Sequence, residues 1–350
     1  MPQRCLDPAG LSIHSFDLTD EQWRSLELEN RRARHLRMPC CSSAVTLKRS
    51  RLGTPFFAHK AVGTCTTAPE TEAHLHLKRM AVEAARGNGW MAHTEVTGTS
   101  PSGEQWKADV FAQNGKSKVV VEVQWSSQTN EELLCRQERY RQSGVRGLWL
   151  LRHPGFPVTR ALPAACIGGS LEEGFLALIP SCSGSQQAVA MRGFLDAAFS
   201  KRLGFGLPLG IHATVSIRAG FLWCWSCGAL TRIITGVDVA FGPDEFGFTI
   251  PELGEYSQPL DSVLSRLPGD LEIGRIKPRF SKTQGRSYMS NGCFHCNAFI
   301  GEFFEHDAWD EQDTVSTFSI RISKEWRKAI ENHCAYSKAW GIYPSAGGSV

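Results

Sequence analysis

Apolar and polar residues in the first part of the chain follow a helical pattern and then an extended one. Residues 19–37 have a helical pattern that ends before Pro39. Two short extended runs follow at 44–48 and 55–58, joined by a turn that contains glycine. We therefore expect a small N-terminal module that contains one helix and two short strands.

The next stretch predicts a longer amphipathic helix. Thr67 and Glu70 have the spacing of a capping box, so the helix should begin there and continue to about Arg86. The sequence Gly87-Asn88-Gly89 then ends it. The apolar stripe that would face a core consists of Ala73, Leu77, Met80, Ala81 and Ala84.

Three strand-like runs follow this helix at 90–96, 106–112 and 118–125, separated by turn-forming residues. A further helix is predicted at about 130–142, and a last strand at 147–151. The predicted order is thus helix, three strands, helix, strand, which indicates an α/β (α+β) core.

The second half of the chain has a weaker pattern. Glycine, serine and proline interrupt residues 154–208, where we expect one helix at 192–202. A β-like segment begins near Ile211, residues 246–278 favour a loop with short elements, and residues 323–339 have a helical pattern.

The composition indicates a globular protein of two or three compact units, since the chain has 350 residues of which 42% are hydrophobic. The N-terminus lacks the pattern of a secretory signal, and we find no membrane segment of ~20 apolar residues. We expect a cytoplasmic location. Thiols stay reduced there, so the clusters among the 12 cysteines favour metal binding over disulfides.

The net charge of only +3 conceals an uneven distribution. No Asp or Glu occurs from Arg31 to Pro69, and this window carries a charge of +8. Such a field favours contact with nucleic-acid phosphates. The alternative is a solvated surface balanced by acids from elsewhere. The charges belong to Arg31, Arg32, Arg34, Arg37, Lys48, Arg49, Arg51 and Lys60.

Two carboxylates lie in neighbouring predicted strands. Asp109 is followed 13 residues later by Glu122, and Gln124 leaves the same face of that strand as Glu122. Buried carboxylates are costly unless something compensates their charge. A catalytic Mg²⁺ or Mn²⁺ ion would compensate it, and it could activate water for attack at phosphorus.

The predicted helices on either side add polar residues. Glu70, His74 and Lys78 are spaced by four residues each and would share one helix face. Arg136 and Tyr140 are one turn apart and could reach phosphate oxygens. The alternative interpretation, a solvated helix face, fits each group alone but not their joint occurrence around the two acids.

Residues 39–151 resemble the competence protein CoiA family, whose nuclease region belongs to the PD-(D/E)xK superfamily. The motifs that carry this resemblance occur in the family's order. They are Phe56-Phe57-Ala58-His59, Glu70-Thr71-x-x-His74-x-x-x-Lys78, Lys107-Ala108-Asp109-Val110, Val121-Glu122-Val123-Gln124, Arg136-x-x-x-Tyr140 and Leu148-Trp149-Leu150-Leu151.

The resemblance implies a restriction-endonuclease-like core, an α-β-β-β-α-β unit with a mixed sheet. It implies that Asp109 and Glu122 bind the catalytic metal. Gln124 replaces the superfamily's usual lysine, and we hypothesise that Lys78 supplies the missing ammonium group. Glu95 is interpreted as a half-exposed strand residue rather than as a site residue.

Two CxxC pairs in the second half predict a structural zinc site, because four thiolates form a closed tetrahedral site. The pairs begin 69 residues apart, so the intervening segment would leave the site and return to it. A redox pair is the rival interpretation, but neither pair follows a βαβ pattern. The four ligands are Cys224, Cys227, Cys293 and Cys296.

A second cysteine cluster precedes the nuclease-like core. In the resembled family a short zinc-ribbon-like module with cysteines occupies this place, which implies metal binding by Cys40, Cys41, His59 and Cys65. Adjacent cysteines seldom direct both side chains at one ion, so free buried thiols remain the alternative.

These observations predict three domains: an N-terminal zinc-ribbon-like module at 1–66, a PD-(D/E)xK nuclease-like core at 67–155, and a C-terminal zinc-binding domain at 156–350. The predicted function is metal-dependent hydrolysis of phosphodiester bonds in DNA. The alternatives are a non-catalytic DNA-binding factor with the same fold and a zinc-stabilised protein adaptor.

Overall fold

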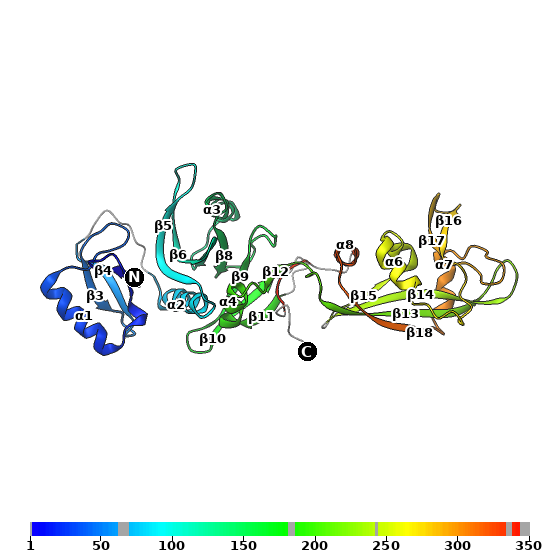
Figure 1. The fold of residues 1–350 in the computed structure, drawn as a ribbon, viewed down its shortest axis with the longest axis horizontal. Helices are drawn as coiled ribbons and strands as arrows, with labels where there is room; N and C mark the ends of the chain where they lie inside the picture. The colour runs from blue at the N-terminus through cyan, green and yellow to red at the C-terminus, as the bar shows by residue number, and fades with distance from the viewer. Residues whose placement is uncertain (1, 62–69, 181–185, 242–243, 334–337, 344–350) are drawn as a thin grey trace. The chain divides into compact units, whose positions relative to one another are not determined.

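The computed structural model describes residues 2–61, 70–180, 186–241, 244–333 and 338–343. The chain divides into two compact units, unit 1 (Met1–Phe205 with Ala339–Val350) and unit 2 (Gly206–Lys338). Unit 2 is inserted between two strands of unit 1, β12 (Leu203–Phe205) and β19 (Trp340–Ile342), which pair with each other (Figure 1). Within the described ranges, the helices are too short or too polar to span a membrane.

The N-terminal part of unit 1 contains one long helix and two β-hairpins, which confirms the predicted helix and extended runs. Trp23 and Phe57 are buried between them with ring centroids 5.2 Å apart. The helix ends where Arg34 adopts a left-handed conformation. The elements are β1 (Arg4–Leu6), β2 (Ser12–His14), η1 (Ser15–Asp17), α1 (Asp20–Ala33), β3 (Val45–Arg49) and β4 (Pro55–His59).

The central part of unit 1 has the predicted order of helix, three strands, helix and strand. Strands β5, β6 and β7 are antiparallel neighbours, and β8 is parallel to β7. The mixed α/β fold is thus confirmed. The elements are α2 (Glu72–Gly87), β5 (Met91–Thr99), β6 (Gln105–Asn114), β7 (Ser117–Gln124), α3 (Asn130–Gln142) and β8 (Arg146–Leu151).

The same sheet continues beyond β8, which the sequence pattern does not predict. Its seven strands have the order β11-β10-β9-β8-β7-β6-β5. The predicted boundary between residues 155 and 156 therefore falls between strands of one sheet, and the three-domain division remains a prediction. The additional elements are β9 (Ala164–Ser170), β10 (Gly174–Pro180), β11 (Gln186–Ala190) and α4 (Met191–Phe199).

Helices cover both faces of this sheet. Leu77 of α2 and Phe194 of α4 pack on one face, and Leu133 and Tyr140 of α3 pack with Trp149 on the other (Figure 1). Because strand side chains alternate between the faces, strands β6, β7, β8 and β9 contribute to both cores. Glu122 on β7 is consequently buried.

The beginning of α2 differs from the prediction. Thr71 is the N-cap, and its hydroxyl accepts a hydrogen bond from the His74 backbone N–H at 3.2 Å. Thr67, the predicted cap, lies outside the described residues. Glu70 therefore precedes the helix and does not share a helix face with His74 and Lys78.

Unit 2 is built on an antiparallel sheet with the order β15-β14-β13-β18. Three short helices, α5, α6 and α8, pack on it around a core that contains Trp326. The elements are β13 (His212–Trp223), β14 (Leu230–Phe241), β15 (Asp244–Phe248), α5 (Ile250–Leu253), α6 (Ser257–Leu264), β16 (Lys277–Ser281), β17 (Arg286–Ser290), α7 (Glu302–Glu305), η2 (His306–Ala308), β18 (Asp313–Arg321) and α8 (Lys324–Asn332).

A buried polar group connects two parts of unit 2. The Asn291 side chain donates to the Ile234 carbonyl at 2.9 Å and to Glu305 Oε1 at 2.7 Å. Burial raises the pKa of Glu305 to about 7, and the Asn291 hydrogen bond only partly opposes this effect. At neutral and alkaline pH this carboxylate therefore carries a charge that the fold solvates poorly.

Glu305→Gln should stabilise the protein against unfolding above pH 7. The folded pKa of Glu305 lies above the unfolded value, so the destabilisation grows from pH 4.5 to 7 and is complete above that range. We expect a gain of roughly 3 kcal/mol at pH 8 that disappears near pH 4.5. Urea unfolding at several pH values measures it, with Glu311→Gln, an exposed position, as control. A gain independent of pH would contradict the assignment.

Candidate active site and metal-binding clusters

Asp109 and Glu122 occupy two adjacent strands of the sheet, β6 and β7. Val110 on β6 pairs with Val121 on β7, and Asp109 Oδ2 accepts a hydrogen bond from the Val123 backbone N–H at 2.9 Å. The structure therefore brings together the two acids that the sequence singles out.

The two carboxyl groups differ in their ionisation. Burial raises the pKa of Glu122 to about 7, and the negative charge of Asp109 adds to this effect. Burial also opposes ionisation of Asp109, but its neighbours His74 and Lys78 outweigh burial and lower its pKa to about 2. Asp109 is the permanently charged member of the pair.

The ammonium group of Lys78 is fully buried and lies among three carboxylates. Its Nζ atom is 2.5 Å from Glu95 Oε1, 2.9 Å from Glu70 Oε1 and 4.0 Å from Asp109 Oδ1. Burial alone would lower the pKa of Lys78, but these carboxylates raise it above its usual value. Lys78 thus stays charged in the interior.

Glu95 is a member of this cluster that the sequence interpretation missed. The expectation of a half-exposed strand residue is wrong, because Glu95 is only 4% exposed. Thr94 pairs with Val110 and Val96 with Ala108, so Glu95 lies across from Asp109. The strand register is the signal that could have identified it.

The backbone of Glu95 has a φ angle of +52°, which is unfavourable for a side chain other than glycine or asparagine. Arg4 Nη2 donates to the Glu95 carbonyl at 3.1 Å, which links β1 to this position. Backbone strain of this kind persists where the surroundings hold it, and it is frequent at functional sites.

Glu70, His74 and Asp109 form a group with the ligands of a divalent ion. One donor atom from each lies within 4.8 Å of the others. His74 Nε2 is buried 3.4 Å from Asp109 Oδ2, and it makes no hydrogen bond among the described residues. Carboxylate oxygens and an imidazole nitrogen suit Mg²⁺ or Mn²⁺, so the residues present fit a cation here.

Glu122 belongs to a second, neighbouring cluster. Its two oxygens accept hydrogen bonds from Arg136 and from the Tyr140 hydroxyl. Arg136 Nη1 also donates to Gln124 Oε1 at 3.1 Å, and its guanidinium lies 5.0 Å from the Trp149 ring centroid. The metal-binding role of Glu122 and the phosphate-binding roles of Arg136 and Tyr140 remain predictions.

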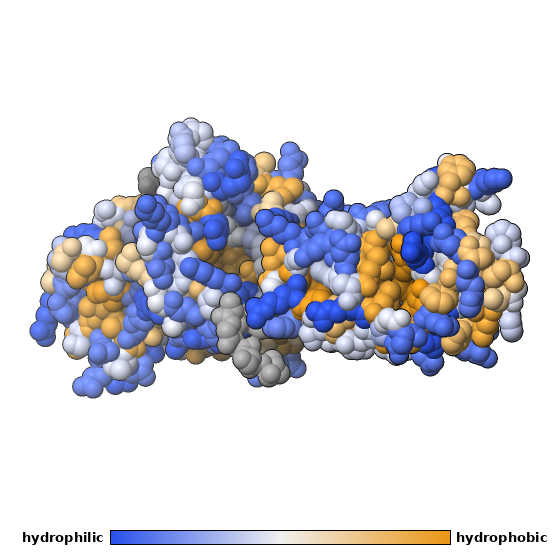
Figure 2. Space-filling model, turned by 45° about the vertical axis from the view of Figure 1, so that its right-hand side comes forward, coloured by the Kyte–Doolittle hydropathy of each residue, from blue (hydrophilic) through white to orange (hydrophobic). Residues whose placement is uncertain are grey.

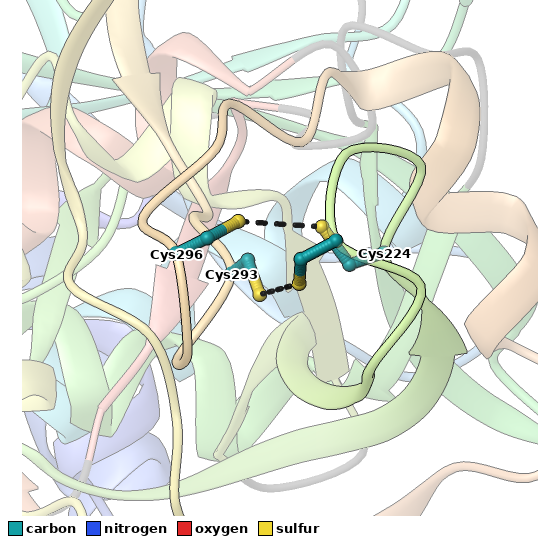
Figure 3. Close-up of side chains that lie close together, drawn as sticks. Cys224, Cys293 and Cys296 are labelled. Atoms are coloured by element: carbon teal, nitrogen blue, oxygen red, sulfur yellow. Dashed lines mark hydrogen bonds between the residues drawn. The ribbon is translucent and has the colours of Figure 1, made fainter.

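The four cysteines of the two CxxC pairs converge in unit 2. Cys224 Sγ is 3.7 Å from Cys296 Sγ, and Cys227 Sγ is 3.8 Å from Cys293 Sγ (Figure 3). Zn–S bonds of about 2.3 Å in a tetrahedron place sulfur atoms at roughly this separation. All four sulfurs lie within 4.8 Å of one another, so the cluster fits one zinc ion.

The N-terminal cluster is also partly assembled. His59 Nε2 is 3.2 Å from Cys41 Sγ and 3.7 Å from Cys40 Sγ, so both adjacent cysteines approach the same ring. This departs from the expectation that adjacent cysteines seldom converge. Cys65 lies outside the described residues, and a metal at this cluster remains a prediction.

The structure thus combines a mixed sheet, helices on both of its faces and two acids on adjacent strands. Residues 70–159 match the family model described as competence protein CoiA, nuclease-like domain. The match confirms the resemblance over this segment, which spans both clusters around Asp109 and Glu122. None of the curated proteins matches the chain.

Lys78→Met should strongly destabilise unit 1, because it leaves Glu70, Glu95 and Asp109 without their shared cation. We expect a loss of about 3–5 kcal/mol in the free energy of unfolding at neutral pH. Urea unfolding followed by tryptophan fluorescence measures it. Lys107→Met, an exposed position on β6, serves as the control. A loss as small as that of the control would show that the buried cluster is not needed for stability.

Cys296→Ser should remove one equivalent of zinc relative to the parent protein, and it should lower the thermal stability of unit 2. A structural zinc site contributes its binding free energy to folding. Metal analysis and thermal unfolding measure the two effects. Cys135→Ser, an exposed single cysteine on α3, is the matched control. An unchanged zinc content in Cys296→Ser would contradict the site.

Proposed function

We propose that this protein is a metal-dependent nuclease that hydrolyses phosphodiester bonds of DNA. The observation that carries the proposal is the group of Glu70, His74, Lys78, Glu95 and Asp109, fully or largely removed from solvent, next to Glu122. So many ionisable groups are rarely buried together for stability alone, since desolvation offsets most of what their pairing contributes. The CoiA nuclease-like match over the same residues supports it.

Mg²⁺ or Mn²⁺ would be held by Asp109 with Glu70 and His74. A bound ion would lower the pKa of a coordinated water and neutralise charge on the phosphate. Lys78 holds Glu70 and Asp109 in place and keeps them ionised, which is a positioning role.

Glu122 and Arg136 would act on the substrate side of the same site. Arg136 donates to Glu122 and Gln124, and a phosphate that takes over these donors would displace Glu122. Glu122, released from Arg136, would then be available to the cation or as a proton acceptor, because its pKa is about 7. Gln124 would orient Arg136.

The partner we propose is DNA, bound partly by the basic window of the N-terminal part. Acids outside that window neutralise some of its charge, since Arg31 pairs with Glu27 and Arg49 with Asp20, each at 2.6 Å. We also propose the cytoplasm as the location, because reduced thiols suit the cysteine clusters.

A non-catalytic DNA-binding factor is the second candidate. The hydrogen bonds that Glu122 accepts from Arg136 and Tyr140 favour this second candidate, since they satisfy the carboxylate without any metal. The two candidates differ in whether the purified protein cleaves DNA.

Asp109→Asn and Glu122→Gln should each reduce cleavage of DNA in Mg²⁺ or Mn²⁺ by roughly 100-fold or more. Loss of residues that only orient metal ligands commonly costs 10–100-fold, so loss of a ligand should cost at least ~100-fold. Single-stranded, duplex and branched DNA are incubated with parent and variants, and products are separated on a gel.

Binding of the same DNA should persist in both variants, because the substitutions remove little surface. Glu104→Gln, an exposed position, should cleave like the parent. Binding without cleavage by the parent in either metal would contradict the proposed activity and favour the binding factor.

A further inference from the structure

One face of the β13–β14 hairpin carries exposed aromatic side chains near its turn. Phe221 pairs with Arg232 and Trp223 with Leu230 across the two strands, and paired residues project from the same face. Trp223 is 72% exposed, whereas the intervening Leu222 is buried beside the cysteine cluster. This arrangement leaves the rings of Phe221 and Trp223 in contact with solvent on one face of the hairpin.

The two CxxC loops add further rings. Trp225 is 69% exposed, and its Nε1 atom donates to the Phe299 carbonyl at 2.8 Å. Phe294 is also exposed, and its backbone N–H donates to Thr231 Oγ1 at 3.0 Å. These bonds and the cysteine cluster hold the loops that present the rings.

A hollow of about 260 Å³ lies beside Phe294, bordered also by Arg275 and Ile276. Figure 2 shows hydrophobic and strongly hydrophilic residues intermixed on the surface of unit 2. We define the stacking surface as Phe221, Trp223, Trp225, Arg232 and Phe294.

A basic segment borders the stacking surface, since Ile273 forms a β-bridge with Arg232. Residues 273–301 contain no Asp or Glu and five basic residues, Arg275, Lys277, Arg279, Lys282 and Arg286. Within the described part of the chain, none of these five forms an ion pair with a carboxylate. Arg232 has its guanidinium 4.4 Å from the Phe221 ring centroid, and its Nε atom has no hydrogen-bond partner among the described residues.

An acidic segment follows directly in sequence and packs against β13, where Asp313 pairs with Ala219. Residues 302–313 contain Glu302, Glu305, Asp307, Asp310, Glu311 and Asp313. Phe303, which is 80% exposed, belongs to this acidic segment. Phe303 is therefore an exposed aromatic ring, like those of the stacking surface, but its neighbours in sequence are acidic rather than basic.

We propose that the stacking surface binds single-stranded DNA. Unpaired bases present their ring faces to exposed aromatic side chains, whereas the bases of a duplex are already stacked on one another. Arg232, Arg275 and Lys277 bind the phosphates that follow the stacked bases. The choice of DNA rests on the proposed function, but the surface is separate from the nuclease-like residues and can be tested by itself.

The test uses the full-length protein and a fluorescein-labelled oligothymidine of about 20 nucleotides, without added Mg²⁺ or Mn²⁺. Fluorescence anisotropy measures the dissociation constant. Trp223→Ala combined with Trp225→Ala should weaken binding by roughly 10- to 100-fold. Phe303→Ala is the matched control and should bind like the parent. Unchanged zinc content in each variant establishes that the loops remain folded.

The salt dependence tests the basic residues. Lys277→Ala should reduce the slope of log affinity against log salt concentration by about 1. A blunt duplex of the same length should bind more weakly to the parent than the single strand does. Its affinity should fall little in the double tryptophan variant. Equal losses for duplex and single strand would overturn base stacking.

Three other results would overturn the proposal. The first is an unchanged affinity in the double tryptophan variant when its zinc content is normal. The second is a loss of affinity in Phe303→Ala as large as that in the double variant. The third is tighter binding of an oligouridine RNA, with the same loss of affinity in the double variant. DNA cleavage by the same preparations tests the nuclease separately. If the parent does not cleave DNA but its binding depends on the two tryptophans, the proposed function is contradicted and the stacking surface is supported. If the parent cleaves DNA and the double tryptophan variant binds like the parent, the nuclease is supported and the stacking surface is contradicted.

Discussion

The buried ammonium group of Lys78 is the interaction on which the arrangement of unit 1 depends. An unpaired ion in a protein interior costs several kcal/mol, which is comparable with the total stability of a domain. Lys78 is compensated only when Glu70, Glu95 and Asp109 are all in place. These carboxylates come from the segment before α2, from β5 and from β6. The ion pairs therefore fix the position of the helix against the two strands more narrowly than apolar packing would.

The same interaction sets the chemical character of the neighbouring acids. The positive charge of Lys78 helps to keep Asp109 ionised, and the charge of Asp109 in turn raises the pKa of Glu122. Two carboxyl groups on adjacent strands are thereby separated into a permanent anion and a group that titrates near neutrality. Such a separation assigns different chemical roles to similar side chains. Arg136 and Tyr140 donate hydrogen bonds to the second group, so its charge depends on these contacts.

Much of this site can be predicted from the sequence, because its parts have local patterns. Helical periodicity identifies α2 and α3, and the two acids stand out in strands that are otherwise apolar. Glu95 has no such pattern, because its burial depends on pairing with a strand that follows it and on a left-handed backbone conformation. Strands β9 to β11 are missed for a related reason. Glycine lies in β9 and β10 and proline ends β10, and hydrogen bonds to β8 and among the three strands define them.

The cysteine cluster in unit 2 explains why aromatic rings can remain exposed nearby. The core around the cysteines is small, with few buried apolar side chains such as Leu222, Ile233 and Ile300. A core of this size contributes little hydrophobic stabilisation, and a metal held by the four sulfurs would add a constraint. A metal that crosslinks two loops distant in sequence fixes them without covering their surfaces. The rings of Trp223 and Trp225 therefore need not turn inward to stabilise the fold, and they stay available to a ligand.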